Sequence, residues 1–315
     1  MQTELVSELI EFLPKGRTRY RYFKDAYVLK LLFMLMDNKE SLRELKVSNR
    51  NNPLLKPLVA ASGNGILKRE DLKMIWREPP QLFLLSLSRW GSERYWRYDQ
   101  ASRQGENLVL QLNLSLEHLR LYRKCIYANG ENTINGAYSF HPVKTPATNR
   151  NYRDTLAWLR IDLDFTTDEG LIKEIQSDCA RTIESMERRL RECGCELCKS
   201  RFEYLSWFSY SEIWAEAILM ATIQFINEEL GINRIFYHTD RSGWQIKGMA
   251  RQWRASRSLY VDLPRKFVFR KTWAAPEFLL KTKSYQKLIR CQPDIDFYQL
   301  DLNKFDHGGG LCLVA

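Results

Sequence analysis

The chain has 315 residues, enough for one large domain or two ordinary ones, and its 44% hydrophobic content indicates a globular protein with a core. No apolar run approaches the roughly 20 residues of a membrane span, and the start lacks a secretory signal. Seven cysteines, an odd number and mostly scattered, argue against a disulfide framework. We therefore expect a cytoplasmic protein with no membrane partner, and a net charge of +10 favours an anionic partner such as nucleic acid or a nucleotide.

The first part of the chain is predicted to be helical. Apolar residues recur at helical spacing in 5–12, and 26–36 reads as a buried helix. We expect a helical N-terminal subdomain at 1–80 and an α+β core domain at 81–315. No linker clearly separates them, so a single domain is the alternative.

Basic and aromatic residues alternate at Arg17-Thr-Arg-Tyr-Arg-Tyr22, and a similar cluster follows at 89–98. Such segments can stack bases on their rings while their cations meet phosphate. The interpretation that we favour for 17–22 is an amphipathic connector whose tyrosines pack inward and whose arginines stay in solvent.

Residues 158–178 are predicted to form a β-hairpin with strands at 158–165 and 171–178 and a turn at 166–170. Both strands alternate with a period of two, so one face is apolar and the other is polar. Because the turn has an odd length, we expect Asp162 to lie opposite Glu174 and Arg160 opposite Gln176. The polar face then carries four carboxylates, an amide and a guanidinium: Asp162, Asp164, Glu174, Asp178, Gln176 and Arg160.

After the hairpin the chain alternates between helices and strands. A helix starts at Ser177 or Asp178 and buries Cys179, a second runs from about 212 to 230 with Gly231 as its C-cap, and a strand at 234–239 leads to Asp240 and Arg241. The predicted fold class is therefore α+β: a mixed sheet around the acidic hairpin, with helices packed on it.

The acidic face is the leading candidate site. Like charges directly opposite each other destabilise a sheet, so a cation, a proton or Arg160 must compensate. We predict that Asp162, Asp164 and Glu174 bind Mg²⁺ or Mn²⁺, because hard cations prefer carboxylate oxygens. Glu174, Gln176 and His238 are predicted to be catalytic, whereas Arg160, Asp178 and Arg241 are expected to contact the substrate. The alternative is an ordinary solvated sheet face.

The order of a helix at 116–126, strands at 157–165 and 171–178, a helix, and a strand at 234–239 resembles the core of restriction-endonuclease-like, or PD-(D/E)xK, nucleases. The resemblance implies a metal held by Asp162 and Glu174. The chain departs from the family at Gln176, which stands where those nucleases have lysine, and no proline precedes Asp162.

Glu174-Ile-Gln-Ser-Asp178 also resembles the EIQSD motif of uncharacterised bacterial and phage proteins. The similarity continues through Trp214, 217–225, Leu230-Gly231 and 237–239, and it includes 107–113 and 263–267, roughly two thirds of the chain. It implies a site at Glu174, Gln176 and Asp178 without an activity, since none is established for that family. Its members tend to have an aromatic residue where this chain has Cys179.

Two other metal sets are weaker alternatives. Cys193, Cys195 and Cys198 lie close together, but structural zinc needs four ligands, so a thiol-rich helix end is the simpler interpretation. His238, Asp240 and His307 match a two-histidine, one-carboxylate iron site, but such sites need more strands than 241–306 offers.

Two functions follow from this sequence. The first is a metal-dependent hydrolase of phosphodiesterase or nuclease type, acting on a phosphate-containing or nucleic-acid substrate at the hairpin. The second is a non-catalytic module that binds a nucleotide, a nucleic acid or a protein.

Overall fold

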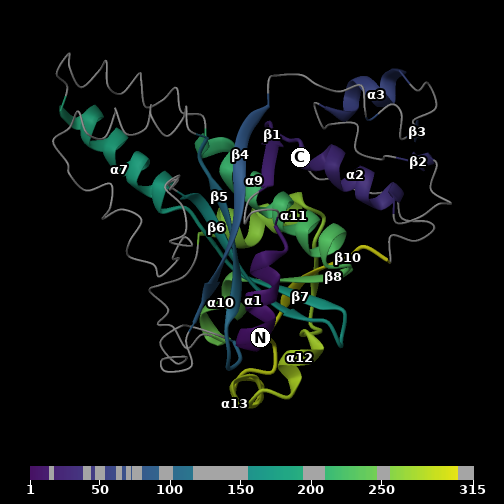
Figure 1. The fold of residues 1–315 in the computed structure, drawn as a ribbon, viewed down its shortest axis with the longest axis vertical. Helices are drawn as coiled ribbons and strands as arrows, with labels where there is room; N and C mark the ends of the chain where they lie inside the picture. The colour runs from purple at the N-terminus through teal and green to yellow at the C-terminus, as the bar shows by residue number, and fades with distance from the viewer. Residues whose placement is uncertain are drawn as a thin grey trace.

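The computed structural model describes residues 1–13, 18–37, 44–46, 54–61, 66–68, 72, 80–91, 102–115, 155–193, 210–246 and 256–303. Within these ranges the protein has an α+β fold, in which helices pack on a mixed sheet of eight strands (Figure 1). The predicted fold class is therefore confirmed.

The described sheet contains one parallel strand pair. Its strands lie in the order β1-β4-β5-β6-β7-β8-β10-β9, and all neighbours are antiparallel except β7 and β8. The strands are β1 (Thr18–Tyr22), β4 (Gln81–Trp90), β5 (Asn107–Asn113), β6 (Thr155–Asp164), β7 (Glu169–Gln176), β8 (Arg234–His238), β9 (Arg270–Thr272) and β10 (Phe297–Asp301). A separate pair consists of β2 (Glu44–Lys46) and β3 (Ile66–Lys68).

The predicted hairpin forms the centre of the sheet as β6 and β7, with β5 and β8 on either side. Its apolar face packs into the main core together with the leucines of β5, whose alternation also predicted a strand. Almost every residue of β5, β6 and β7 is buried, on the polar face as well as on the apolar one. The hairpin is therefore an interior element, and its charges need partners inside the protein.

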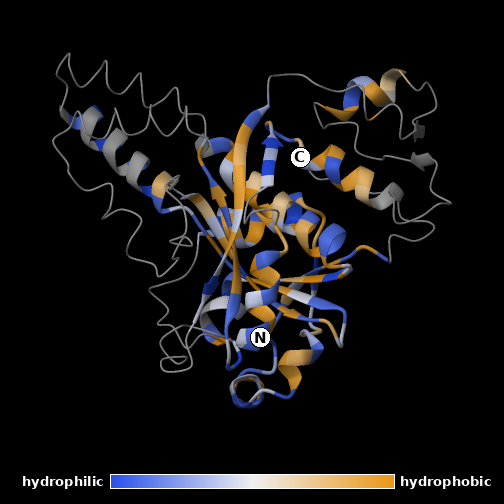
Figure 2. Cartoon of the chain, in the orientation of Figure 1, coloured by the Kyte–Doolittle hydropathy of each residue, from blue (hydrophilic) through white to orange (hydrophobic). Residues whose placement is uncertain are grey.

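Helices cover both faces of the sheet. The main core joins the apolar face to α1 (Thr3–Glu11), α2 (Tyr27–Asp37), α9 (Tyr210–Gln224), the π-helical turns η2 (Phe225–Glu229) and η4 (Ser258–Asp262), and α11 (Leu263–Lys266). A second core on the other face joins Leu171, Phe236 and Phe297 to α10 (Asp240–Ile246), α12 (Glu277–Leu280) and α13 (Lys283–Cys291). The remaining helices are α3 (Leu55–Ala61) and α7 (Asp178–Cys193). Figure 2 shows the apolar residues along the sheet and the helices packed on it, whereas α13 is largely hydrophilic.

The second long helix ends where the sequence predicted. Gly231 has a φ of 71°, its amide donates to Asn227 O at 3.0 Å, and the Ile232 amide donates to Ile226 O at 3.0 Å. A residue with positive φ that closes the last turn in this way is what a helix C-cap requires. The chain then enters β8 directly.

The described N-terminal elements share the core of the rest of the chain. β1 pairs with β4 at one end of the main sheet, and α1 and α2 pack in the main core. Lys266 of α11 bonds both Asp25 and Glu216 of α9, and Tyr22 donates to Glu216 at 3.1 Å. In the described part of the chain, no helix is long and apolar enough to cross a membrane.

Candidate functional site

The register of the hairpin differs from the predicted one. Arg160 lies opposite Glu174, and Asp162 lies opposite Leu171. The turn at 165–168 has one residue fewer than expected, and Lys173 is an extra residue that forms a bulge on β7. The prediction that Asp162 faces Glu174 and Arg160 faces Gln176 is therefore wrong.

The polar face is nevertheless continuous over four strands. One row runs across β4 to β7 through Ser88, Val109, Arg160 and Glu174. The next row runs through Ser86, Gln111, Trp158 and Gln176. Ser86, Gln111, Asn113 and Thr155 are joined by hydrogen bonds of 2.8–3.2 Å. These amides and hydroxyls satisfy one another instead of facing solvent.

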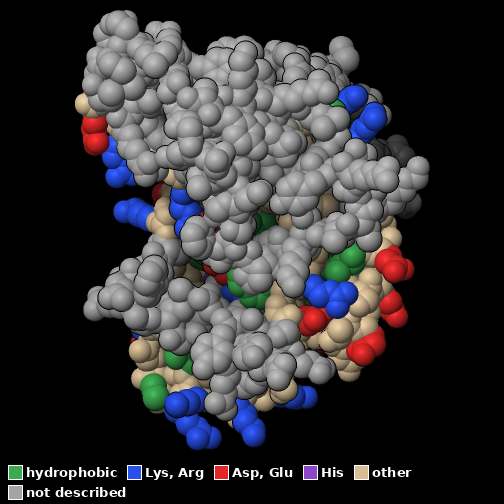
Figure 3. Space-filling model, turned by 60° about the vertical axis from the view of Figure 1, so that its left-hand side comes forward, with side chains coloured by type: hydrophobic (Ala, Val, Ile, Leu, Met, Phe, Trp, Pro, Cys, Tyr) green, Lys and Arg blue, Asp and Glu red, His purple; other side chains and the backbone are tan. Residues whose placement is uncertain are grey.

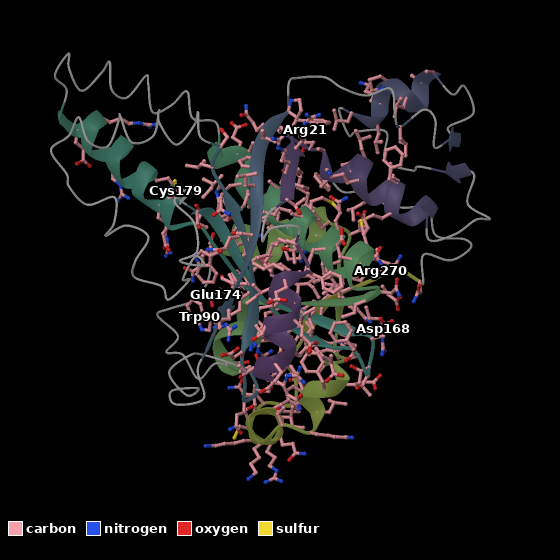
Figure 4. All side chains as sticks on the ribbon, in the orientation of Figure 1. Arg21, Trp90, Asp168, Glu174, Cys179 and Arg270 are labelled. Carbon is pink, nitrogen blue, oxygen red and sulfur yellow. The ribbon has the colours of Figure 1, made fainter. Side chains whose placement is uncertain are left out.

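Arg160 and Glu174 form a buried ion pair. Arg160 is fully buried, and its Nη2 donates to Glu174 Oε2 at 2.6 Å. The other Glu174 oxygen accepts from Gln176 Nε2. The guanidinium also lies 4.8 Å from the ring centre of Trp90, which stacks on Trp158. Figure 4 labels Trp90 and Glu174, the two residues that contact this guanidinium. Both oxygens of Glu174 are thus occupied by side chains of the protein.

Asp162 has cationic partners of its own. Arg103 Nε and Nη2 donate hydrogen bonds of 2.9–3.1 Å to its carboxylate, and Lys173 Nζ lies 3.9 Å from its Oδ2. The N-terminal ammonium of Met1 lies 3.7 Å from Asp162 Oδ1. Burial raises the pKa of Asp162, but the attraction of Lys173 and Arg103 outweighs burial, so the pKa lies below the ordinary value of 3.8.

Asp164, the third proposed metal ligand, accepts from Arg103 Nη1 at 3.1 Å. Each of the three carboxylates therefore already binds a protein cation, which leaves little negative charge for a divalent ion. Among the described residues, no group of three or more His, Cys, Asp and Glu side chains is placed to hold a metal. The side chains at the predicted Mg²⁺ or Mn²⁺ site do not fit such an ion.

The carboxyl ends of β7 and β8 meet at one edge, because the two strands are parallel. Their pairing ends at Ile172 and Tyr237, just before Glu174 and His238. His238 is buried, and its Nδ1 lies 3.1 Å from Ser242 Oγ in the first turn of α10. Tyr260 of η4 hydrogen-bonds the backbone of Ile175, and its pKa is raised, first by burial and then by the charge of Glu174. Two of the predicted catalytic residues thus lie near the carboxyl ends of neighbouring strands: Glu174 is two residues before the end of β7, and His238 is the last residue of β8.

The predicted substrate contacts are separated. Asp178 begins α7 and pairs with the exposed Arg181, which also donates to Gln176 Oε1 at 2.8 Å. Ser177 caps the helix, since its Oγ accepts from the Ala180 amide at 2.9 Å. Arg241 is exposed on α10, and no hydrogen bond or ion pair joins it to a described residue of the hairpin.

The tyrosines of the first basic and aromatic cluster are not available for stacking. Tyr20 and Tyr22 are buried in β1, whereas Arg19 and Arg21 are exposed, as the connector interpretation predicted. In the second cluster Trp90 is buried, and 92–98 lie outside the described residues. Cys195, Cys198 and His307 also lie outside them, and Cys193 ends α7.

Sequence reasoning missed a basic surface near the end of the chain. α13 buries Tyr285 in the second core and exposes Lys283, Lys287 and Arg290, which we call the α13 cation stripe. These positions are spaced i, i+4 and i+7, so they share one helix face. Lys281, just before the helix, is also exposed. Figure 3 shows Lys and Arg side chains gathered at the lower end of the molecule, where α13 lies in Figure 1. The spacing of these three cations in the sequence was the signal that could have identified this surface.

Comparison of the chain with protein-family models, curated proteins and solved structures found no significant match.

Proposed function

We propose that the protein is a non-catalytic module that binds nucleic acid through the α13 cation stripe. The observation that carries this proposal is that Lys283, Lys287 and Arg290 are exposed and have no acidic partner among the described residues. Most other cations discussed above are paired within the protein, as Arg103 and Arg160 are. The stripe is therefore available for an external anion.

The dimensions of the stripe favour a polymer over a single nucleotide. Arg290 lies seven positions after Lys283 in the helix, which corresponds to about 10 Å along the axis. That length exceeds a single phosphate group and suits successive phosphates of a backbone. Cations that neutralise such phosphates release bound counterions, and the release makes affinity depend steeply on salt.

The pairing of the hairpin carboxylates also supports a binding role over a metal-dependent hydrolase. A metal site needs carboxylate oxygens that are free to turn toward the ion. Arg103, Arg160 and Gln176 occupy those oxygens here. The specific observation that favours a second candidate, an enzyme, is that Glu174 and His238 lie at the carboxyl ends of the parallel strands, where α/β sheets commonly bind ligands.

The proposal is tested by fluorescence anisotropy with a labelled oligonucleotide over a range of salt concentrations. Replacing Lys283, Lys287 and Arg290 together by glutamine should weaken binding. It should also reduce the slope of log affinity against log salt by about 1 for each phosphate that the variant no longer neutralises.

The matched control is the double variant Arg19→Gln, Arg21→Gln. These arginines are exposed on β1, at the opposite end of the sheet from β9. The control should leave most of the binding and the salt slope unchanged. Equal loss in both variants would mean that only the overall charge matters, and unchanged binding in the stripe variant would refute the proposal.

A further inference from the structure

Trp273 is the most exposed large hydrophobic side chain among the described residues. Its side chain is 65% exposed, whereas Phe12 and Phe165 are 54% and 45% exposed. A single exposed apolar side chain is ordinary on a protein surface. Trp273 differs because its backbone is fixed and because the Lys271 ammonium lies beside its ring.

The backbone on both sides of Trp273 is anchored. Before it, β9 pairs with β10, and Thr272 lies opposite Phe297. After it, the Ala274 amide donates to Thr272 Oγ1 at 3.1 Å, and Ala275 and Phe278 enter the second core. The indole is therefore presented on a short fixed connection, so that binding a flat ligand would require little additional ordering of the chain.

The charges beside the ring suit a nucleic acid. Lys271 Nζ lies 5.5 Å from the ring centre of Trp273 and also pairs with Asp296, which holds it in place. An aromatic ring next to a cation can stack a base while the cation meets the adjoining phosphate.

We infer that Trp273 is a stacking platform for an unpaired base of a single-stranded nucleic acid, with the Lys271 ammonium beside the ring to meet a neighbouring phosphate. The inference rests on the proposed function and specifies its ligand. A base inside a duplex has both faces covered by its neighbours, so the platform selects single strands.

The test compares an oligothymidine with an abasic oligonucleotide of the same length, which has the phosphates but lacks the bases. The wild-type protein should prefer the oligothymidine. Trp273→Leu should weaken binding of the oligothymidine by about 5- to 100-fold and leave abasic binding and the salt slope unchanged. Trp273→Phe should keep most of the preference, and Phe165→Leu, an exposed aromatic in the hairpin turn, should keep all of it.

The outcomes separate the two proposals. If the stripe variant weakens both oligonucleotides equally while Trp273→Leu removes only the preference for bases, both proposals hold. If the wild type binds the two oligonucleotides equally, the stacking site is refuted and the cation stripe stands. Absence of binding to either would refute the proposed function as well. A change in oligomeric mass on Trp273→Leu without a change in base preference would assign the ring to a contact between copies of the chain.

Discussion

A buried guanidinium needs a negatively charged partner, and Arg160 Nη2 lies 2.6 Å from Glu174 Oε2. Replacing Glu174 by glutamine would leave the arginine charge buried without its counter-charge. We expect Glu174→Gln to lower the free energy of unfolding by about 3 kcal/mol, as loss of one partner from a buried ion pair usually does. Urea unfolding at neutral pH measures this change.

Two further variants isolate the cause of that loss. Adding Arg160→Met to Glu174→Gln should recover part of the stability, because the unpaired charge is removed. Glu212→Gln breaks the pair with Lys24, in which both side chains are 59% exposed, and should change stability by less than about 1 kcal/mol. Equal losses from the buried and the exposed pair would contradict the assignment.

Asp162 should make stability depend on pH in the acidic range. Its pKa in the folded protein is below the unfolded value of 3.8, so the ionised carboxylate stabilises the folded state. This contribution is present above pH 3.8 and is lost as the pH falls through the folded pKa. The difference in unfolding free energy between wild type and Asp162→Asn should be largest near neutral pH and shrink toward about pH 2.

Urea titrations at several pH values check this expectation, with Asp294→Asn as the control because that carboxylate is exposed. The free energy of unfolding of the control should equal that of the wild type at all pH values. A difference between wild type and Asp162→Asn that stays constant down to the lowest pH would show that the charge of Asp162 is not the source of its contribution.

The limits of sequence reasoning at the residue scale are visible in Tyr20 and Trp273. The alternation of Arg and Tyr in 17–22 was compatible with base stacking and with a buried face, and the pairing of β1 with β4 decided for burial. Trp273 gave no pattern, because a lone tryptophan is equally compatible with a core position. Whether a ring is exposed depends on tertiary neighbours that a local pattern does not contain.

At the scale of elements, two glycines with positive φ precede strands, and they differ in how much space a side chain would have there. Gly105 precedes β5 with a φ of 108°, and a Cβ there would lie 2.3 Å from Met1 O. Gly231 precedes β8 with a φ of 71°, and a Cβ there would meet nothing within 4 Å. We expect Gly231→Ala to lower stability by about 1 kcal/mol and Gly105→Ala by about 3 kcal/mol.

Thermal or chemical unfolding of the two alanine variants measures the comparison directly. Both variants carry the strain of a positive φ, and the excess loss in Gly105→Ala reports the steric clash with Met1 O together with the greater strain of a φ of 108°. If the two variants lose the same stability, the contact between the start of the chain and the segment before β5 contributes nothing.

The hairpin shows how far an alternating pattern predicts an element. The strands, their apolar face and their central position could be read from 158–178, because a period of two identifies a half-apolar strand. The register could not, because Lys173 is an extra residue within an otherwise regular alternation. The partners of the carboxylates could not be predicted either, since Arg103 is 59 residues from Asp162 in the chain.

For the molecule as a whole, the two buried carboxylates of the hairpin's polar face already have cationic partners, since Asp162 pairs with Arg103 and Glu174 with Arg160. A divalent cation should therefore find no dedicated site on the hairpin. We expect millimolar Mg²⁺ or Mn²⁺ to change the melting temperature only as much as a monovalent salt of the same ionic strength does.

Calorimetry of the wild type and of Asp162→Asn, Glu174→Gln at matched ionic strength tests this expectation. The double variant should melt at a lower temperature than the wild type, and the melting temperature of neither protein should respond specifically to the divalent ion. A rise in the wild-type melting temperature that the double variant lacks would restore the metal-dependent hydrolase as the better function.

The parallel pairing of β7 with β8 affects the order in which the sheet assembles. The antiparallel pair of β6 and β7 needs only the turn at 165–168, whereas β8 reaches β7 after the long crossover through α7 and α9. Closing a long loop is slower than closing a short one. During synthesis the hairpin can form as soon as Gln176 has left the ribosome, but the carboxyl edge that holds both Glu174 and His238 appears only when β8 arrives. Substitutions in the turn should therefore alter the refolding rate, and substitutions in β8 should chiefly alter the unfolding rate.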